Sequence, residues 1–156
     1  MHVHQRRLRL KGGEGFEINA AAAIRQRRIL LARRLTRHPG ELARMLVHEV
    51  FHFAWVRLSN ARRRSFEELI AAEFARHARG ELGWSSETRK RGLSPAESTA
   101  GARRWREYLS ESFCDTAAWL YGGVALHEEF TLAERWRASR TRWFRNFCRP
   151  GGQVAI

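Results

Sequence analysis

Cysteine is scarce in this chain, and long apolar runs are missing from it. The two cysteines, Cys114 and Cys148, are far apart and form no C-x-x-C pair, so we expect buried thiols rather than a disulfide framework. No apolar run approaches the roughly 18 residues that span a bilayer, which predicts a protein without a membrane-spanning helix. The N-terminal residues also lack the apolar core of a secretory signal, and a cytoplasmic location is expected.

Lysine is rare as well, because Lys11 and Lys90 are the two in the chain and arginine supplies nearly all the positive charge. The formal net charge is +13 for 156 residues, which suggests an anionic partner such as nucleic acid. The arginines are spread along the sequence, however, and a GC-rich genome produces the same bias without any partner. Solvated faces are the favoured interpretation, and nucleic-acid binding is the alternative.

The first forty residues carry the signals for strands. Gly12–Gly15 predicts a turn, and the alternation over residues 16–18 after it is typical of the start of a strand. Residues 28–32 are apolar and β-branched enough for a second strand. The four alanines at positions 20–23 favour helix, so the structure between the two strands stays open.

The rest of the chain predicts helices. Apolar spacing, Pro39 in a first turn and glycine stop signals mark four of them, over residues 39–53, 65–79, 98–121 and 132–147. Residues 83–95 are rich in glycine, serine and proline and are expected to form a loop. The fold class is therefore α+β, dominated by helices, in one domain over residues 1–156.

The segment His48–His52 has the pattern H-E-x-x-H within the first predicted helix. Residues four apart lie one turn apart on the same helix face, so both imidazoles can reach one metal ion. Glu49 is offset from the two histidines and can lie beside a metal-bound water. This spacing is typical of zinc hydrolases, in which the glutamate is the general base.

A catalytic zinc site needs a third protein ligand. The extended motif with a third histidine is excluded, because Trp55 stands at its glycine position and Leu58 at its histidine position. A glutamate from a later helix, with an acid four residues further on, is the other common arrangement. Glu111 and Asp115, the single aspartate of the chain, fit this pattern. Asp115 is then expected to accept a hydrogen bond from the non-metal nitrogen of His48.

On these five residues (His48, Glu49, His52, Glu111 and Asp115) the chain resembles the gluzincin branch of the zincin metallopeptidases. The resemblance implies a zincin-like fold, with a small sheet beside the H-E-x-x-H helix. It also implies one Zn²⁺ per chain and hydrolysis of peptide bonds in peptides or unfolded protein. A nucleic-acid-associated or regulatory zinc protein without turnover is the alternative function.

Other histidines and one further pair offer weaker candidates. Glu73 and His77 are also four apart on a predicted helix and offer an alternative ligand, although a satisfied structural pair is the favoured interpretation. His2, His4 and His38 are expected at the surface or the terminus.

Three residues near the predicted ligand helix are candidate donors to an oxyanion: Tyr108, Tyr121 and His127. For Tyr108, a position in the core is the favoured alternative. Cys114 follows Glu111 by three residues and is expected to pack rather than to bind metal. We expect an extended substrate to lie beside an edge strand, with residues 28–32 as the candidate strand.

Overall fold

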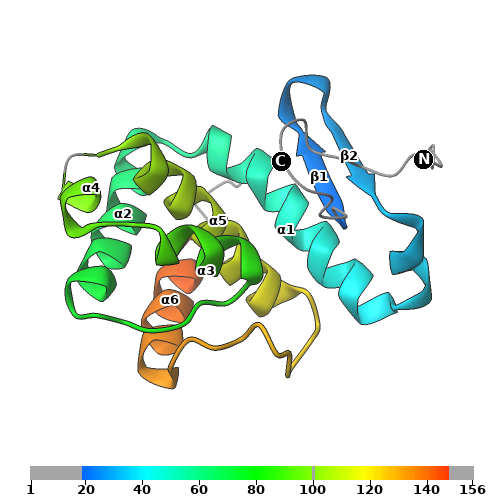
Figure 1. Ribbon diagram of the computed structural model, residues 1–156. Coiled ribbons are helices and arrows are strands. Elements are labelled where there is room, and N and C mark those ends of the chain that lie inside the picture. The colour runs from blue at the N-terminus through cyan, green and yellow to red at the C-terminus, as the bar shows by residue number, and fades with distance from the viewer. Residues whose placement is uncertain (1–18, 100, 148–156) are drawn as a thin grey trace.

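The structure is a computed structural model that describes residues 19–99 and 101–147 (Figure 1). The strand expected at residues 16–18 lies outside the described residues, as do His2, His4 and Cys148. Of the described residues, 69% are helical, and they contain one two-stranded sheet, which confirms the helix-dominated α+β class. Over the described ranges, no helix combines the length and apolar character needed to cross a bilayer.

The secondary structure begins with a hairpin and continues with helices. The elements in chain order are β1 (Ala20–Ala23), η1 (Ile24–Gln26), β2 (Arg28–Leu31), η2 (Arg33–Arg37), α1 (Pro39–Arg57), α2 (Asn60–Ala75), α3 (Trp84–Arg91), α4 (Pro95–Thr99), α5 (Arg103–Tyr121) and α6 (Glu134–Phe147).

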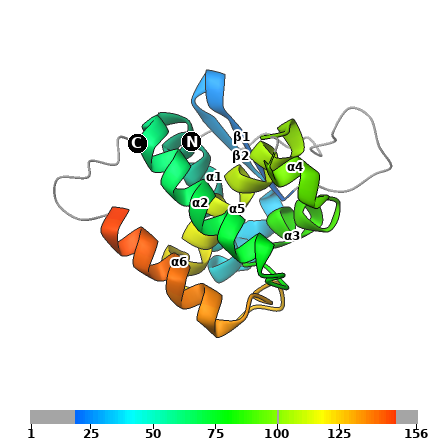
Figure 2. The ribbon, with the colours of Figure 1, turned by 90° about the vertical axis from the view of Figure 1, so that its left-hand side faces the viewer.

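The two longest helices, α1 and α5, pack along each other and form the centre of the molecule (Figure 1). Helices α2 and α6 cover one side of this pair, and α3 lies against α5, as the view in Figure 2 also shows. The main core lies between α1, α2, α5 and α6. It is built from large apolar side chains, among them Phe66, Ile70, Trp105, Leu109, Phe113 and Phe144. Burial of this surface is what holds the two motif helices in a fixed relation.

Strands β1 and β2 form an antiparallel hairpin that packs on α1. The four alanines of β1 are therefore extended, against the helix preference of alanine. They pair in register with the apolar strand Arg28–Leu31, and Ala32 N–H donates to the Asn19 carbonyl at 2.7 Å. Cross-strand pairing and burial against α1 outweigh the small intrinsic preference of alanine.

Residues 83–95, which were expected to form a loop, contain the helix α3, so that prediction was wrong. Glu87 lies in its first turn, and three basic residues lie in its last turn, which complements the helix dipole at both ends. Ser86 is fully buried, and its Oγ donates to the Gly83 carbonyl at 3.1 Å. The helix is thus held by local bonds and by packing on α5, which the glycine and serine content of the segment concealed.

The other helices are found where the sequence predicted them, with shifted ends. Helix α2 starts at Asn60 because Ser59 caps it, its Oγ accepting a hydrogen bond from Arg62 N–H at 3.3 Å. The helix expected over residues 98–121 is divided into the short α4 and the long α5.

A buried ion network joins α2, α5 and α6 to the turn before α3. Arg140 donates to Glu73 Oε2 at 2.6 Å and to Glu81 Oε2 at 2.7 Å, and Tyr108 O–H donates to Glu81 Oε1 at 2.5 Å. Arg140 and Glu81 are 0% exposed. Because these charges are paired, burying them costs much less free energy than burying an isolated ion would.

Candidate metal centre

Helix α1 places His48 and His52 on one face, one turn apart. Pro39 fits the first turn of this helix, and Glu41 lies near its positive end, so the motif falls well inside a regular segment. The two Nε2 atoms are 3.2 Å apart. Both imidazoles therefore direct the same ring nitrogen to one point, as the spacing predicted.

Helix α5 brings Glu111 to the same point. Its Oε2 lies 3.3 Å from His48 Nε2 and 3.8 Å from His52 Nε2. Ligand atoms of the three residues all lie within 4.8 Å of one another, an arrangement that could hold a metal ion. Among the described residues, this is the one group of histidine, cysteine and acidic side chains with that property.

The dimensions of this triangle fit a tetrahedral zinc site. Zinc binds nitrogen and oxygen at about 2.0–2.1 Å, so two ligands of a tetrahedron are about 3.3 Å apart. The separations of 3.2 and 3.3 Å from His48 Nε2 match this value, and the 3.8 Å between His52 and Glu111 is longer. Two imidazoles and a carboxylate also leave a fourth position open, as catalytic zinc sites require.

Asp115 fixes the orientation of His48. Its Oδ1 accepts a hydrogen bond from His48 Nδ1–H at 2.7 Å, and its Oδ2 accepts one from Ser86 N–H at 2.9 Å. Both oxygens of this buried carboxylate are thus used, and the nearby His48 and Ser86 hold its pKa below the ordinary value although burial acts to raise it. With Nδ1 protonated, Nε2 is the nitrogen left for a metal, as expected from the sequence.

The carboxylates set the charge of the two imidazoles in the metal-free chain. Burial acts to lower the pKa of His48, but Asp115 and Glu111 outweigh it and raise that pKa to about 10. Burial and the neighbouring His48 lower the pKa of His52 to about 4. A metal ion that binds here would compete with a proton for Nε2 of His48.

Glu49 lies beside the donor triangle and faces the hairpin. Its side chain is buried, and the backbone of Ala22 in β1 hydrogen-bonds to its carboxylate. Burial raises the pKa of Glu49 to about 7 in spite of the nearby charge of His48. Glu49 is not one of the metal-binding group, and its role as a base stays a prediction.

Helix α3 contributes Arg89, a residue that the sequence interpretation did not find. Its Nη2 lies 3.2 Å from Glu111 Oε1, the carboxylate oxygen that does not face the histidines. The acidic first turn and basic last turn of α3 were the available signal for this helix. This signal predicts the helix but not the contact of Arg89 with Glu111, which depends on the packing of α3 on α5.

Each of the three candidate oxyanion donors contacts a residue outside the metal-binding group. Tyr108 is 1% exposed and bonds to Glu81, which is the core position given as its alternative. Tyr121 is half exposed and stacks on Phe51 with ring centroids 5.7 Å apart. His127 Nε2 lies 3.4 Å from Glu41 Oε2, two turns of α1 before His48.

The other candidate ligands from the sequence lie outside the metal-binding group. Glu73 is buried and paired with Arg140, whereas His77 is exposed in a left-handed conformation at φ 55°, so the two form no ligand pair. Cys114 is a fully buried free thiol in the main core, which confirms the packing role predicted for it. His38 is exposed ahead of α1, as expected.

Comparisons of the chain with protein-family models, with curated proteins and with solved structures found no match. The functional interpretation therefore depends on the geometry of this centre and on the surfaces around it.

Proposed function

We propose that this chain is a zinc-dependent hydrolase that cleaves peptide bonds, with a zincin-like arrangement of its motif helices and sheet. One observation carries the proposal: His48, His52 and Glu111 direct three donor atoms to one point, with separations that suit a tetrahedral zinc ion. The hydrogen bond from His48 to Asp115 and the position of Glu49 support it.

His48, His52 and Glu111 would hold the ion, since imidazole and carboxylate are usual zinc ligands. Zinc, when bound, supplies a Lewis acid and lowers the pKa of water from 15.7 to about 7. Asp115 keeps the ring of His48 in the tautomer and orientation that binding needs. Arg89 restrains the second oxygen of Glu111, so that the carboxylate presents Oε2 to the histidines.

Glu49 is the general base in this mechanism. Its carboxylate takes a proton from the water that attacks the peptide carbonyl, and the new C–O bond forms at that carbon. The same carboxyl then delivers the proton to the leaving nitrogen as the C–N bond breaks. A glutamate that lies next to the ligands, and does not bind with them, is suited to this role.

Strand β1 supplies the edge along which a peptide would lie. The Asn19 carbonyl accepts a hydrogen bond from Ala32 N–H, just after β2. Because the backbone groups of successive residues point to opposite edges of a strand, those of Ala20 and Ala22 point away from β2. The contact between Ala22 and Glu49 agrees with this. The edge beside the base thus belongs to β1, rather than to the strand at 28–32 that was expected, and extended peptides are its natural occupants.

The test compares the wild type with Glu49→Gln and with the control Glu107→Gln, which removes an exposed acid one turn before Glu111. Cleavage of an unfolded protein would be followed by mass spectrometry of new termini, together with the zinc content of each variant. The proposal predicts that Glu49→Gln keeps zinc and loses about 10²–10⁴-fold in rate, while Glu107→Gln is unchanged. Full activity in Glu49→Gln, or zinc-loaded wild type that cleaves nothing, would contradict it.

A further inference from the structure

The hairpin and the turn after it form an arginine-rich projection, which we call the arginine arm and define as residues 19–37. The arm contains six arginines and no acidic residue, a large share of the formal net charge of +13. They are Arg25, Arg27, Arg28, Arg33, Arg34 and Arg37. The positive charge is therefore concentrated at one place in the fold, although the arginines as a whole are spread along the sequence.

The arm gathers unpaired arginines that the helical body spreads out. In the body, some arginines pair with acids, as Arg44 does with Glu41 and Arg91 with Glu87, and others, such as Arg76, Arg79 and Arg145, make no hydrogen bond, ion pair or ring contact with the described residues. Within residues 19–99 and 101–147, five arm side chains likewise make none of these contacts, and all five fall within residues 25–37: Arg25, Arg27, Arg28, Arg33 and Arg37. All five are exposed. Like charges held together without counter-ions in this way are ready for an anionic partner.

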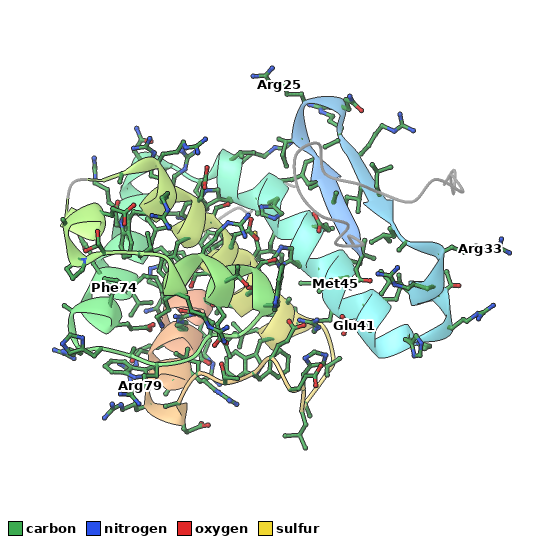
Figure 3. The ribbon with its side chains drawn as sticks, in the orientation of Figure 1. Arg25, Arg33, Glu41, Met45, Phe74 and Arg79 are labelled. Atoms are coloured by element: carbon green, nitrogen blue, oxygen red, sulfur yellow. The ribbon has the colours of Figure 1, made fainter. Side chains whose placement is uncertain are left out.

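The tip of the arm lies beyond the helical body, although both strands and η2 contact α1. In Figures 1 and 2 the hairpin extends beyond the helices, with its base against α1. In Figure 3 the side chain of Arg25 points outward from its tip and that of Arg33 from the turn after β2. The tip is a tight turn in which Arg27 takes a left-handed conformation at φ 50° and bonds to the Ile24 carbonyl at 3.2 Å.

We propose that the arginine arm binds the phosphate backbone of duplex DNA. Guanidinium groups match phosphate oxygens with two parallel hydrogen bonds, and a two-stranded β-ribbon fits the major groove. Arg28 at the tip and Arg33 in η2 are five residues of extended chain apart, about 16 Å. The major groove is about 12 Å wide, so the two groups of arginines can reach phosphates on opposite sides of it.

A lipid surface fits the arm less well than DNA does. Insertion into a membrane interface requires large apolar or aromatic side chains beside the basic ones, and without them each arginine gains only about 1 kcal/mol from an anionic lipid surface. The exposed large apolar residues of the described chain are Leu46, Val56, Trp84, Tyr121 and Leu126, and none of them belongs to the arm. Strand β1 is made of alanine alone, which keeps the ribbon thin.

DNA binding goes beyond the proposed hydrolysis and does not depend on it, because no arm arginine is a metal ligand. The test uses the triple variant Arg25→Gln, Arg27→Gln, Arg28→Gln. The matched control is Arg76→Gln, Arg79→Gln, Arg145→Gln, which removes three exposed arginines from the body. Figure 3 shows Arg79 on the side of the molecule away from Arg25. Both variants lose the same charge, so a general electrostatic effect would weaken them equally.

Fluorescence anisotropy with a labelled duplex of about 20 base pairs would be measured between about 50 and 200 mM salt. The arm variant should bind at least about tenfold more weakly, and the slope of log K against log salt should fall by about 2.7, for three lost phosphate contacts. The control should stay within about twofold of the wild type in the same salt range. Thermal melting of each variant checks that the fold is kept.

The proposal would be overturned by equal losses in the two triple variants, by no DNA binding in the wild type, or by a wild type that binds anionic phospholipid vesicles in preference to DNA. Duplex RNA of the same length should bind more weakly, since its major groove is too deep and narrow for the ribbon. Tighter binding to RNA would contradict the fit to the groove.

Discussion

Asp115 on α5 accepts a hydrogen bond from His48 on α1 through Oδ1 and Nδ1, 2.7 Å apart in a buried environment. This bond joins the two helices that carry the metal-binding group and leaves the other nitrogen of His48 directed at His52 and Glu111. Because Asp115 also accepts from the backbone of Ser86, the same carboxylate connects the centre to α3. Three helices are thus held together at one side chain.

Substitution Asp115→Asn should weaken zinc binding by about 10–100-fold, the range found when a group that supports a metal-binding histidine is lost. The amide has a single acceptor oxygen, so it cannot serve His48 Nδ1–H and Ser86 N–H together. The measurement is a competition titration against a chromophoric chelator. Ser112→Ala on the same helix is the control, since Ser112 Oγ is buried and has no hydrogen-bond partner among the described residues. Equal zinc affinity in Asp115→Asn and Ser112→Ala would contradict the role given to Asp115.

Gly83→Ala should disturb the same carboxylate from the other side. A Cβ at Gly83 would overlap the Asp115 carboxylate, while the backbone there is extended and free of strain. We expect a loss of about 1–3 kcal/mol in the free energy of unfolding, because a buried side chain must move. Weaker zinc binding should accompany it.

Gly40→Ala is the control for this effect, because its added Cβ would meet Val124 Cγ2 at an ordinary 3.5 Å. Urea denaturation and the chelator titration apply to both variants. If Gly83→Ala behaves like Gly40→Ala in both measurements, the close packing of α3 on Asp115 is not what positions His48.

Arg140→Met should destabilise the fold by about 3–5 kcal/mol, since it leaves two buried carboxylates, Glu73 and Glu81, without their main partner. Arg142→Met removes an exposed arginine from the same helix and serves as the control. Urea denaturation at neutral pH measures both. A change below about 1 kcal/mol in Arg140→Met would show that the network is not a significant part of the stability.

The network also predicts a sign for the pH dependence. Burial acts to raise the pKa of Glu81, but Arg140 and Lys90 hold it below its ordinary value. A lowered folded-state pKa gives stability that is present above the unfolded value of about 4.3 and lost as the pH falls through the folded value. The unfolding free energy of the wild type should therefore fall on acidification, and the slope should be smaller in Arg140→Met. Equal slopes would contradict this assignment.

The metal centre could be predicted from the sequence because its residues form two pairs, each close together within one helix. His48 and His52, and Glu111 and Asp115, are each pairs four residues apart within a helix, and only the meeting of α1 and α5 had to be inferred. The alanine strand β1 could not be predicted, since its conformation depends on pairing with β2 and contact with α1.

Helix α3 and the arginine arm were missed for different reasons. The glycine and serine content of the α3 segment suggested a loop, although the charges at its ends fit a helix. The arm was hidden because arginine is common throughout the chain, and the sequence alone does not tell which arginines lie near an acid. Only the fold shows which arginines pair with acids, as Arg44 and Arg91 do, and that the unpaired ones at residues 25–37 share one hairpin and the turn after it.

The most direct test of the account is the zinc content of protein purified without chelators, measured by elemental analysis for the wild type, Glu111→Ala and Glu107→Ala. The two variants each remove one glutamate from α5, one turn apart, and only Glu111 faces the histidines. The account predicts one zinc per chain in the wild type and in Glu107→Ala, and its loss from Glu111→Ala. Zinc retained by Glu111→Ala, or a wild type that takes up no zinc when it is offered, would contradict the three-ligand centre.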